Sequence, residues 1–115
     1  MSVIVRTRKL DDVVILDLNG RLTIGEGTQT IRETIRALMQ SDYRKFLINL
    51  GGVDYIDSSG LGELVRCFTT VRKETGGQMK LLNLTRRVHD LLQITKLLTV
   101  FEAFDNETEA VKSML

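Results

Sequence analysis

The sequence has little of the chemistry on which several classes of protein depend. It holds one cysteine, Cys67, and one histidine, His89, in 115 residues. A single cysteine cannot form an internal disulfide, and one cysteine, one histidine and scattered carboxylates offer no spacing for metal ligands. We therefore predict no metal, no cofactor and a reducing compartment. The chain also has no proline, an absence from which no functional conclusion follows.

Long apolar runs and an excess of one charge are missing too. No stretch approaches the roughly 18 consecutive apolar residues of a membrane-spanning helix. Arg6, Arg8 and Lys9 interrupt the N-terminus where a signal peptide would have its apolar core. Lys and Arg number 16 and Asp and Glu 15, a net charge of +1, which gives no overall attraction to nucleic acid or to an anionic membrane. We predict a cytoplasmic protein that binds neither nucleic acid nor a membrane.

The composition that is present is that of a globular domain. Hydrophobic residues make up 43% of the chain and charged residues 27%, which excludes global disorder. The length predicts one domain over residues 1–115 that buries about two thirds of the surface its unfolded chain exposes. The sequence gives no indication of the oligomeric state.

The first part of the chain predicts a β-hairpin. Residues 3–9 alternate with period two, residues 11–12 are a turn signal, and residues 13–18 form a second β-rich run closed by Asn19-Gly20. Residues 21–24 would continue briefly as extended chain. The close spacing of the two runs indicates antiparallel pairing.

The rest of the chain alternates between helical and strand patterns. A loop at 25–27 precedes a predicted helix over 27–41, and residues 46–50 form a short apolar run that predicts a buried central strand. The glycine pair 51–52 would end that strand, and residues 53–56 would carry the chain over the end of the sheet. A second helix is predicted from residue 58, with its apolar face over 61–71 and its end at Gly76-Gly77, and a strand follows over 79–84. The remaining predicted elements are a helix capped by Thr85 that contains 88–94, a strand over 98–101, and a helix that begins at Asn106. The predicted fold is α/β, with an initial hairpin, mostly parallel strands after it and about four helices.

The richest local signal lies between the central strand and the second helix, at residues 54–62. Two hydroxyls, two glycines and a carboxylate stand at a helix start, where backbone N–H groups lack partners within the helix and favour anions. In parallel sheets, ligands bind in the loops at the carboxyl ends of the strands. Asp57 or Ser58 could simply cap the helix. Alternatively, one serine is a phosphate acceptor, which would add roughly −1.5 to −2 charges at a place that the fold tolerates.

The segment Asp57–Gly62 after an apolar strand resembles the motif of STAS-domain proteins and, more narrowly, that of the bacterial anti-sigma-factor antagonists. The resemblance covers nearly the whole chain. Residues 19–22 are similar to the end of the family's first hairpin, residues 76–81 to its Gly-Gly turn into the next strand, and residues 88–98 to its hydrophobic helix and following turn.

The resemblance implies a binding switch that is not an enzyme. Family members bind an anti-sigma factor that is also a serine kinase, and binding releases the sigma factor. The kinase phosphorylates the first serine of the motif and inactivates the antagonist, and a metal-dependent serine phosphatase restores it. Carried over, the acceptor is Ser58. The predicted surroundings of the acceptor and contacts to the partner are Asp57, Ser59, Gly60, Leu61, Gly62, Arg21 and Thr23.

Two of these positions depart from the family pattern. Arg21 stands where the family often has Glu, and Thr23 where it often has Asp. Because this region is where family members meet their kinase, the resemblance leaves the kinase partner open. Two other functions also stay open: a STAS scaffold without a phosphate cycle, and a domain that binds a nucleotide or small ligand at the same helix start.

Other chemistry-bearing residues receive simpler interpretations. Ser58 lacks the Gly-x-Ser-x-Gly context of a hydrolase nucleophile, and we predict that His89 is a partly exposed helix residue rather than a catalytic base. Arg86, Arg87 and His89 are expected to form a solvated basic face. Cys67 is expected to be a buried or half-buried thiol.

Overall fold

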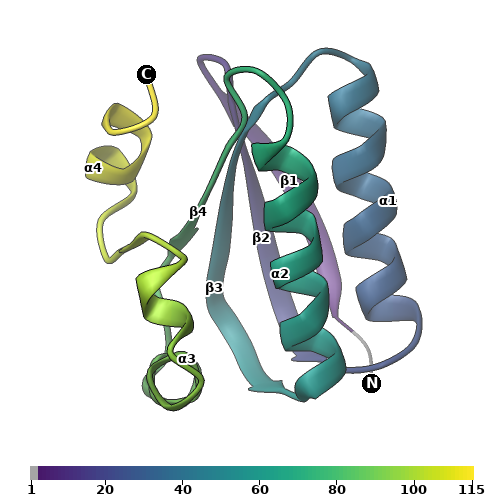
Figure 1. Cartoon of the computed structure of the whole chain (residues 1–115), viewed down its shortest axis with the longest axis vertical. Coiled ribbons are helices and arrows are strands. Elements are labelled where there is room, and N and C mark those ends of the chain that lie inside the picture. The colour runs from purple at the N-terminus through teal and green to yellow at the C-terminus, as the bar shows by residue number, and fades with distance from the viewer. Residues whose placement is uncertain (1–2) are drawn as a thin grey trace.

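The computed structural model describes residues 3–115. It contains a mixed sheet of five strands in the order β1-β2-β3-β4-β5, with four α-helices and one short 3-10 helix in the described part of the chain (Figure 1). The elements are β1 (Ile4–Leu10), β2 (Val13–Leu22), α1 (Glu26–Gln40), β3 (Lys45–Ile56), α2 (Ser58–Arg72), β4 (Gln78–Leu82), α3 (Arg86–Ile94), the 3-10 helix η1 (Leu97–Thr99), β5 (Ala103–Phe104) and α4 (Glu107–Lys112).

The predicted hairpin and the predicted parallel strands are confirmed. Strand β1 pairs antiparallel with β2 across the turn at residues 11–12, where Asp11 adopts a left-handed φ of 56°. The pairs β2–β3, β3–β4 and β4–β5 are parallel. The parallel strands all end at one edge of the sheet, which is the edge that matters for the site.

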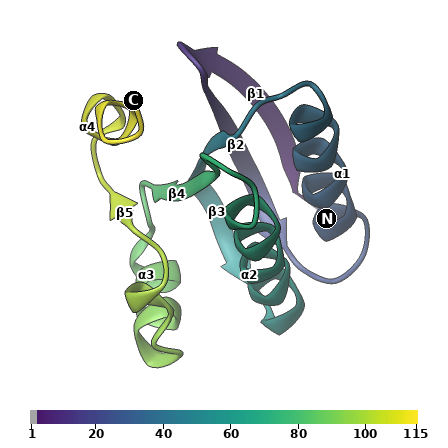
Figure 2. The same cartoon turned by 45° about the horizontal axis from the view of Figure 1, so that its top comes forward.

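The helices divide unequally between the two faces of the sheet. Apolar side chains of α1, α2 and α3 pack on one face, over alternate residues of β2 and β3 that include Leu16 and Ile48. The other face carries Ile15 and Leu47 and is covered by the short helix α4 (Figure 2). The alternation follows from the period of two in a strand, which sends successive side chains to opposite faces.

The predicted break at Gly51-Gly52 is wrong, because β3 runs through both glycines to Ile56. The pairing of β2 with β3 shifts register twice near this point, as a β-bulge does. A Cβ on Gly52 would lie 2.8 Å from the backbone oxygen of Leu18 and closer still to the side chain of Asn19, so glycine is needed here for close approach of two strands rather than to end one. As a result, residues 53–56 belong to the strand and carry it to the end of β2.

Two smaller predictions also need correction. Helix α1 begins at Glu26, so Gly27 is a buried residue of its first turn and not part of a loop. Residues 98–101 do not form a strand: Lys96 takes a left-handed φ of 63°, and the chain turns through η1 before the two-residue strand β5 at 103–104. Leu97 and Leu98 pack against the core from this turn.

The caps predicted for α3 and α4 are confirmed, whereas α2 ends at Arg72, four residues before the predicted stop at Gly76-Gly77. The hydroxyl of Thr85 accepts a hydrogen bond from Val88 N, and the side chain of Asn106 accepts one from Glu109 N. After α2 the chain turns at Gly76, whose φ is 78°. No helix within residues 3–115 is both long enough and apolar enough to cross a membrane.

Candidate functional site

Asp57 makes the junction between β3 and α2. Its Oδ1 accepts a hydrogen bond from Gly60 N at 2.8 Å, and its Oδ2 accepts one from Ile24 N at 3.2 Å. Its own backbone N–H donates to the carbonyl of Leu22 at 3.2 Å. One residue therefore caps α2 and ties the helix start to the segment that leaves β2.

The Asp57 carboxyl is held in its charged form. The backbone N–H of Gly60, followed by those of Ile24 and Ser59, lowers the pKa of Asp57 below its ordinary value, against a smaller opposing effect of burial. The start of α2 therefore carries a negative charge at neutral pH, placed where the positive end of the helix dipole favours it.

Ser58 is exposed, and its hydroxyl makes no hydrogen bond to any residue in 3–115. Of the two capping interpretations left open by the sequence, the structure therefore shows Asp57 as the cap. Ser58 opens the helix with its hydroxyl facing solvent, whereas the neighbouring Ser59 is half-buried. The exposed hydroxyl has no structural role in the helix start.

The two glycines of the motif have different surroundings. A Cβ on Gly60 would lie 2.1 Å from the carbonyl oxygen of Leu22, so the helix can approach β2 this closely only with glycine. Gly62 is exposed and has no atom within 4 Å of the Cβ position, so packing within the chain does not require glycine there. Leu61, between them, is half-buried and packs on the core.

Arg21 and Thr23 lie beside this helix start, at the end of β2. The register pairs Arg21 with Tyr55, and the guanidinium of Arg21 lies 4.7 Å from the centre of the Tyr55 ring, a cation–π geometry. Thr23 is half-buried and directly precedes Ile24, whose N–H donates to Asp57. The structure thus brings residues 21–24 and 57–62 together at one edge of the sheet.

A groove next to this edge was not foreseen from the sequence. It has a volume of about 580 Å³ and lies between the end of β3 and α3, lined by residues that include Tyr55, Arg87 and Ile94. Ile94, which lies in the segment that resembles the family's hydrophobic helix, is 80% exposed, and Ile24, whose N–H donates to Asp57, is 77% exposed. Exposed isoleucines near one edge are typical of a binding surface, but their exposure is visible only in the structure.

The basic cluster and the cysteine lie as predicted. Arg86 is almost fully exposed and His89 is half-exposed in α3, which confirms a solvated face. Cys67 is buried in α2, and burial, reinforced by the carboxylate of Glu63, raises the pKa of its thiol to about 12. Among residues 3–115, no three His, Cys, Asp or Glu side chains gather in a way that could hold a metal ion.

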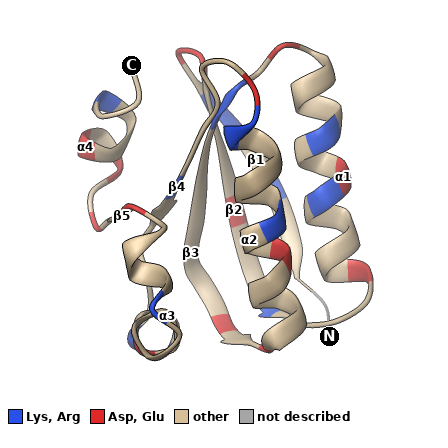
Figure 3. Ribbon diagram, viewed as in Figure 1, with Lys and Arg blue, Asp and Glu red and all other residues tan. Residues whose placement is uncertain are grey.

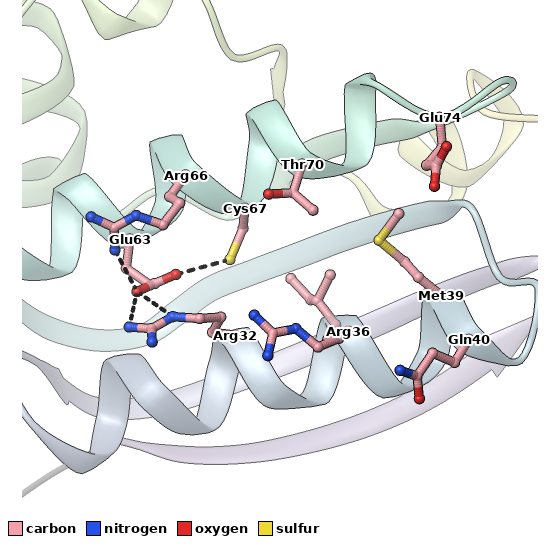
Figure 4. Close-up of a pocket in the computed structure, with 10 residues that line it drawn as sticks. Arg32, Arg36, Met39, Gln40, Glu63, Arg66, Cys67, Thr70 and Glu74 are labelled. Atoms are coloured by element: carbon pink, nitrogen blue, oxygen red, sulfur yellow. Dashed lines mark hydrogen bonds and ion pairs between the residues drawn. The ribbon is translucent and has the colours of Figure 1, made fainter.

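Glu63 is a charged residue that the sequence did not single out. It lies in α2 five residues after Ser58 and is only 1% exposed. Its Oε1 accepts hydrogen bonds from Nη2 of Arg32 at 2.7 Å and from Nη1 of Arg66 at 3.1 Å, and its Oε2 accepts one from Cys67 (Figure 4). Burial alone would raise the pKa of Glu63, but the Arg32 and Cys67 hydrogen bonds and the arginine charges outweigh it, so the net pKa is lowered. A buried carboxylate thus joins α1 to α2.

Comparison with known proteins gives the same family as the motif. Residues 5–110 match the STAS domain family model. The anti-sigma-B factor antagonist of Bacillus subtilis is 31% identical over 104 residues, which are 89% of this chain and 91% of that protein. A crystal structure of a Thermotoga maritima protein superposes with a TM-score of 0.87 at 27% identity, covering 96% of this chain and 93% of the other. The phosphorylated form of the Bacillus cell fate determinant SpoIIAA shares the fold, with a TM-score of 0.76 at 21% identity over 97% of this chain and all of that one. This chain belongs to the STAS domain family.

Proposed function

We propose that this protein is a cytoplasmic anti-sigma-factor antagonist, a binding protein rather than an enzyme, and that Ser58 is the phosphate acceptor of its switch. The partner is an anti-sigma factor with serine kinase activity, whose capture releases a sigma factor. A serine phosphatase resets the switch. The observation that carries the proposal is that Ser58 presents an exposed hydroxyl without a structural role, on a helix start held in place by Asp57 and Gly60.

The local electrostatics suit a switch that acts on the partner and leaves the fold intact. A phosphoserine carries roughly −1.5 to −2 charges, and a helix N-terminus tolerates it. It would stand next to the ionised Asp57, so the edge would gain a concentrated negative charge. Because Ser58 is exposed, the free domain accommodates this charge in solvent.

The surface around Ser58 is suited to protein binding. Exposed Ile24 stands on one side of Asp57, and the groove with Tyr55 and Ile94 lies along the end of β3. Gly62 leaves an open patch on α2 that a partner's backbone can approach closely. The charges around this apolar area are mixed, with Arg21 and Arg87 near Asp57 and with Arg86 paired to Asp90, so a partner with charges of both signs would be complementary.

Phosphate in the middle of such an interface would be costly. Burying an uncompensated dianion costs several kcal/mol, which corresponds to a loss of affinity of at least about 100-fold. We therefore expect Ser58→Asp to bind the anti-sigma factor far more weakly than Ser58→Ala does. Ser59→Asp is the matched control for added charge one residue away, and it should weaken binding less because Ser59 is half-buried beside the helix start.

The first experiment is mass spectrometry of the protein isolated from its own cells, with and without phosphatase treatment. A single phosphate on Ser58 that phosphatase removes is the expected result. Calorimetry of the Ser58 variants with a co-purified serine kinase would follow. A Ser58 that stays unmodified under all growth and stress conditions would contradict the switch and favour a scaffold function, as would equal affinities of folded Ser58→Asp and Ser58→Ala.

A further inference from the structure

A second concave site lies between α1 and α2, away from the Ser58 edge. It is a pocket of about 290 Å³, and its lining includes the buried Glu63 and its half-exposed partner Arg32, together with Arg36, Arg66, Met39 and Cys67 (Figure 4). Helices α1 and α2 lie side by side, and each carries both basic and acidic positions (Figure 3). Nothing in the proposed switch uses these residues.

The charges around Glu63 do not balance. Three guanidinium groups, those of Arg32, Arg36 and Arg66, line the pocket near a single buried carboxylate. Arg32 and Arg66 each donate to the same oxygen of Glu63, and the guanidinium of Arg36 forms no ion pair or hydrogen bond with any residue in 3–115. The lining therefore sets three guanidinium groups against the carboxylates of Glu63 and Glu74, and Arg36 keeps unused N–H donors.

The other end of the pocket differs in chemistry. Ile35 and Met39 supply an apolar wall, and Cys67, which contacts Glu63, adds an uncharged thiol, because burial raises its pKa to about 12. Glu74 stands at the far rim and would repel a second anionic group there. A ligand that fits both ends has a negative head toward Arg36 and Arg66 and an apolar body toward Met39.

We propose that this pocket binds a small organic anion, a carboxylate or phosphate monoester with an apolar body of a few carbons. Guanidinium forks pair well with either head group. A volume of about 290 Å³ is close to the lower limit for ligand pockets, and it holds about ten non-hydrogen atoms if each occupies roughly the 30 Å³ of a liquid water. The site lies on the helix that begins at Ser58, but binding there does not depend on the switch.

The test is an NMR titration of the whole chain at about 0.15 M salt, where exposed charges are well screened. The probes are hexanoate, hexyl phosphate and the neutral hexanol. We expect saturable shifts of amides in residues 32–40 and 63–74 with at least one of the two anions, and at least tenfold weaker binding of hexanol. Arg36→Gln should weaken binding about tenfold or more, because it removes a charged donor that no other described residue uses.

The control variant is Lys112→Gln, which removes the same charge from α4 on the opposite face of the sheet. It should leave the affinity for the anions unchanged. The proposal is overturned if neither anion gives saturable shifts in the pocket, if hexanol binds as tightly, or if Arg36→Gln and Lys112→Gln have equal effects. Because Ser58→Ala leaves the pocket intact, repeating the titration with that variant separates this site from the switch.

Discussion

The first turn of α2 and its middle turn are built in opposite ways. At the first turn, the side chain of Ser58 is free and the backbone around it is fixed by the Asp57 cap and by contact of Gly60 with Leu22. In the middle, the side chain of Glu63 is buried and fixed by two arginines and a thiol. The exposed site at Ser58 therefore depends on backbone geometry, whereas the packing of α1 against α2 depends on hydrogen bonds and ion pairs between side chains.

The largest effect should come from disturbing the backbone contact at the first turn. Gly60→Ala places a Cβ 2.1 Å from a backbone oxygen that cannot move aside without shifting β2 or α2. We expect a loss of stability of about 3 kcal/mol or more, as for severe overpacking of a core position. Urea unfolding followed by circular dichroism measures it.

Gly62→Ala is the matched control for that substitution. It changes the same residue type two positions later, at an exposed site where the new Cβ meets no atom within 4 Å. Because alanine has the higher helix propensity, this variant should be more stable than the parent protein by up to about 1 kcal/mol. Similar destabilisation by both substitutions would show that the contact with Leu22 does not set the requirement for glycine.

A medium effect is expected in the middle turn. Glu63→Gln keeps the shape of the side chain and removes the charge that Arg32 and Arg66 share, which should cost about 1–2 kcal/mol through weaker hydrogen bonds. Glu74→Gln removes a carboxylate from the exposed rim of the same pocket and should change stability by no more than about 0.5 kcal/mol. Chemical denaturation of both variants measures their free energies of unfolding. Equal losses of stability would mean that the buried charge of Glu63 contributes nothing to stability.

The contrast between the two turns also explains what could be predicted from the sequence. The first turn is specified by adjacent residues, so Asp57 and Ser58 could be recognised together in the chain. Glu63 could not, because its burial depends on Arg32, which is 31 residues away in the sequence. The same limit applies to Gly52, which reads as a strand break until the contact with Asn19 is known.

Elements with local signals were therefore predicted best. The caps at Thr85 and Asn106 and the hairpin turn at 11–12 each depend on residues within three or four positions, and all three are confirmed. The strand predicted at 98–101 failed because its apolar residues serve a turn that packs on the core. Periodicity alone does not separate the two outcomes for so short a run.

The smallest effect is a pH dependence at the first turn. Hydrogen bonds from the N–H groups of Gly60, Ile24 and Ser59 lower the pKa of Asp57. A carboxyl with a lower pKa in the folded state stabilises the fold above its unfolded pKa of about 3.9, and this contribution is lost as the pH falls through the folded value. Asp57→Asn should therefore lower the Tm by a few degrees at pH 7, and the difference from the parent protein should shrink below about pH 4.

Asp54→Asn is the matched control for this pH dependence, since it makes the same change at an exposed residue whose side chain forms no hydrogen bond with any residue in 3–115. Its Tm difference from the parent protein at pH 7 should be small. Glu63 also has a lowered pKa, so the parent protein and both variants should still lose stability in acid. In Asp57→Asn, only the part of this acid-induced loss of stability that is due to Asp57 should be absent. A Tm difference for Asp57→Asn that stays constant from pH 7 to about pH 3 would show that the shape of the cap, and not its charge, holds Ser58 in place.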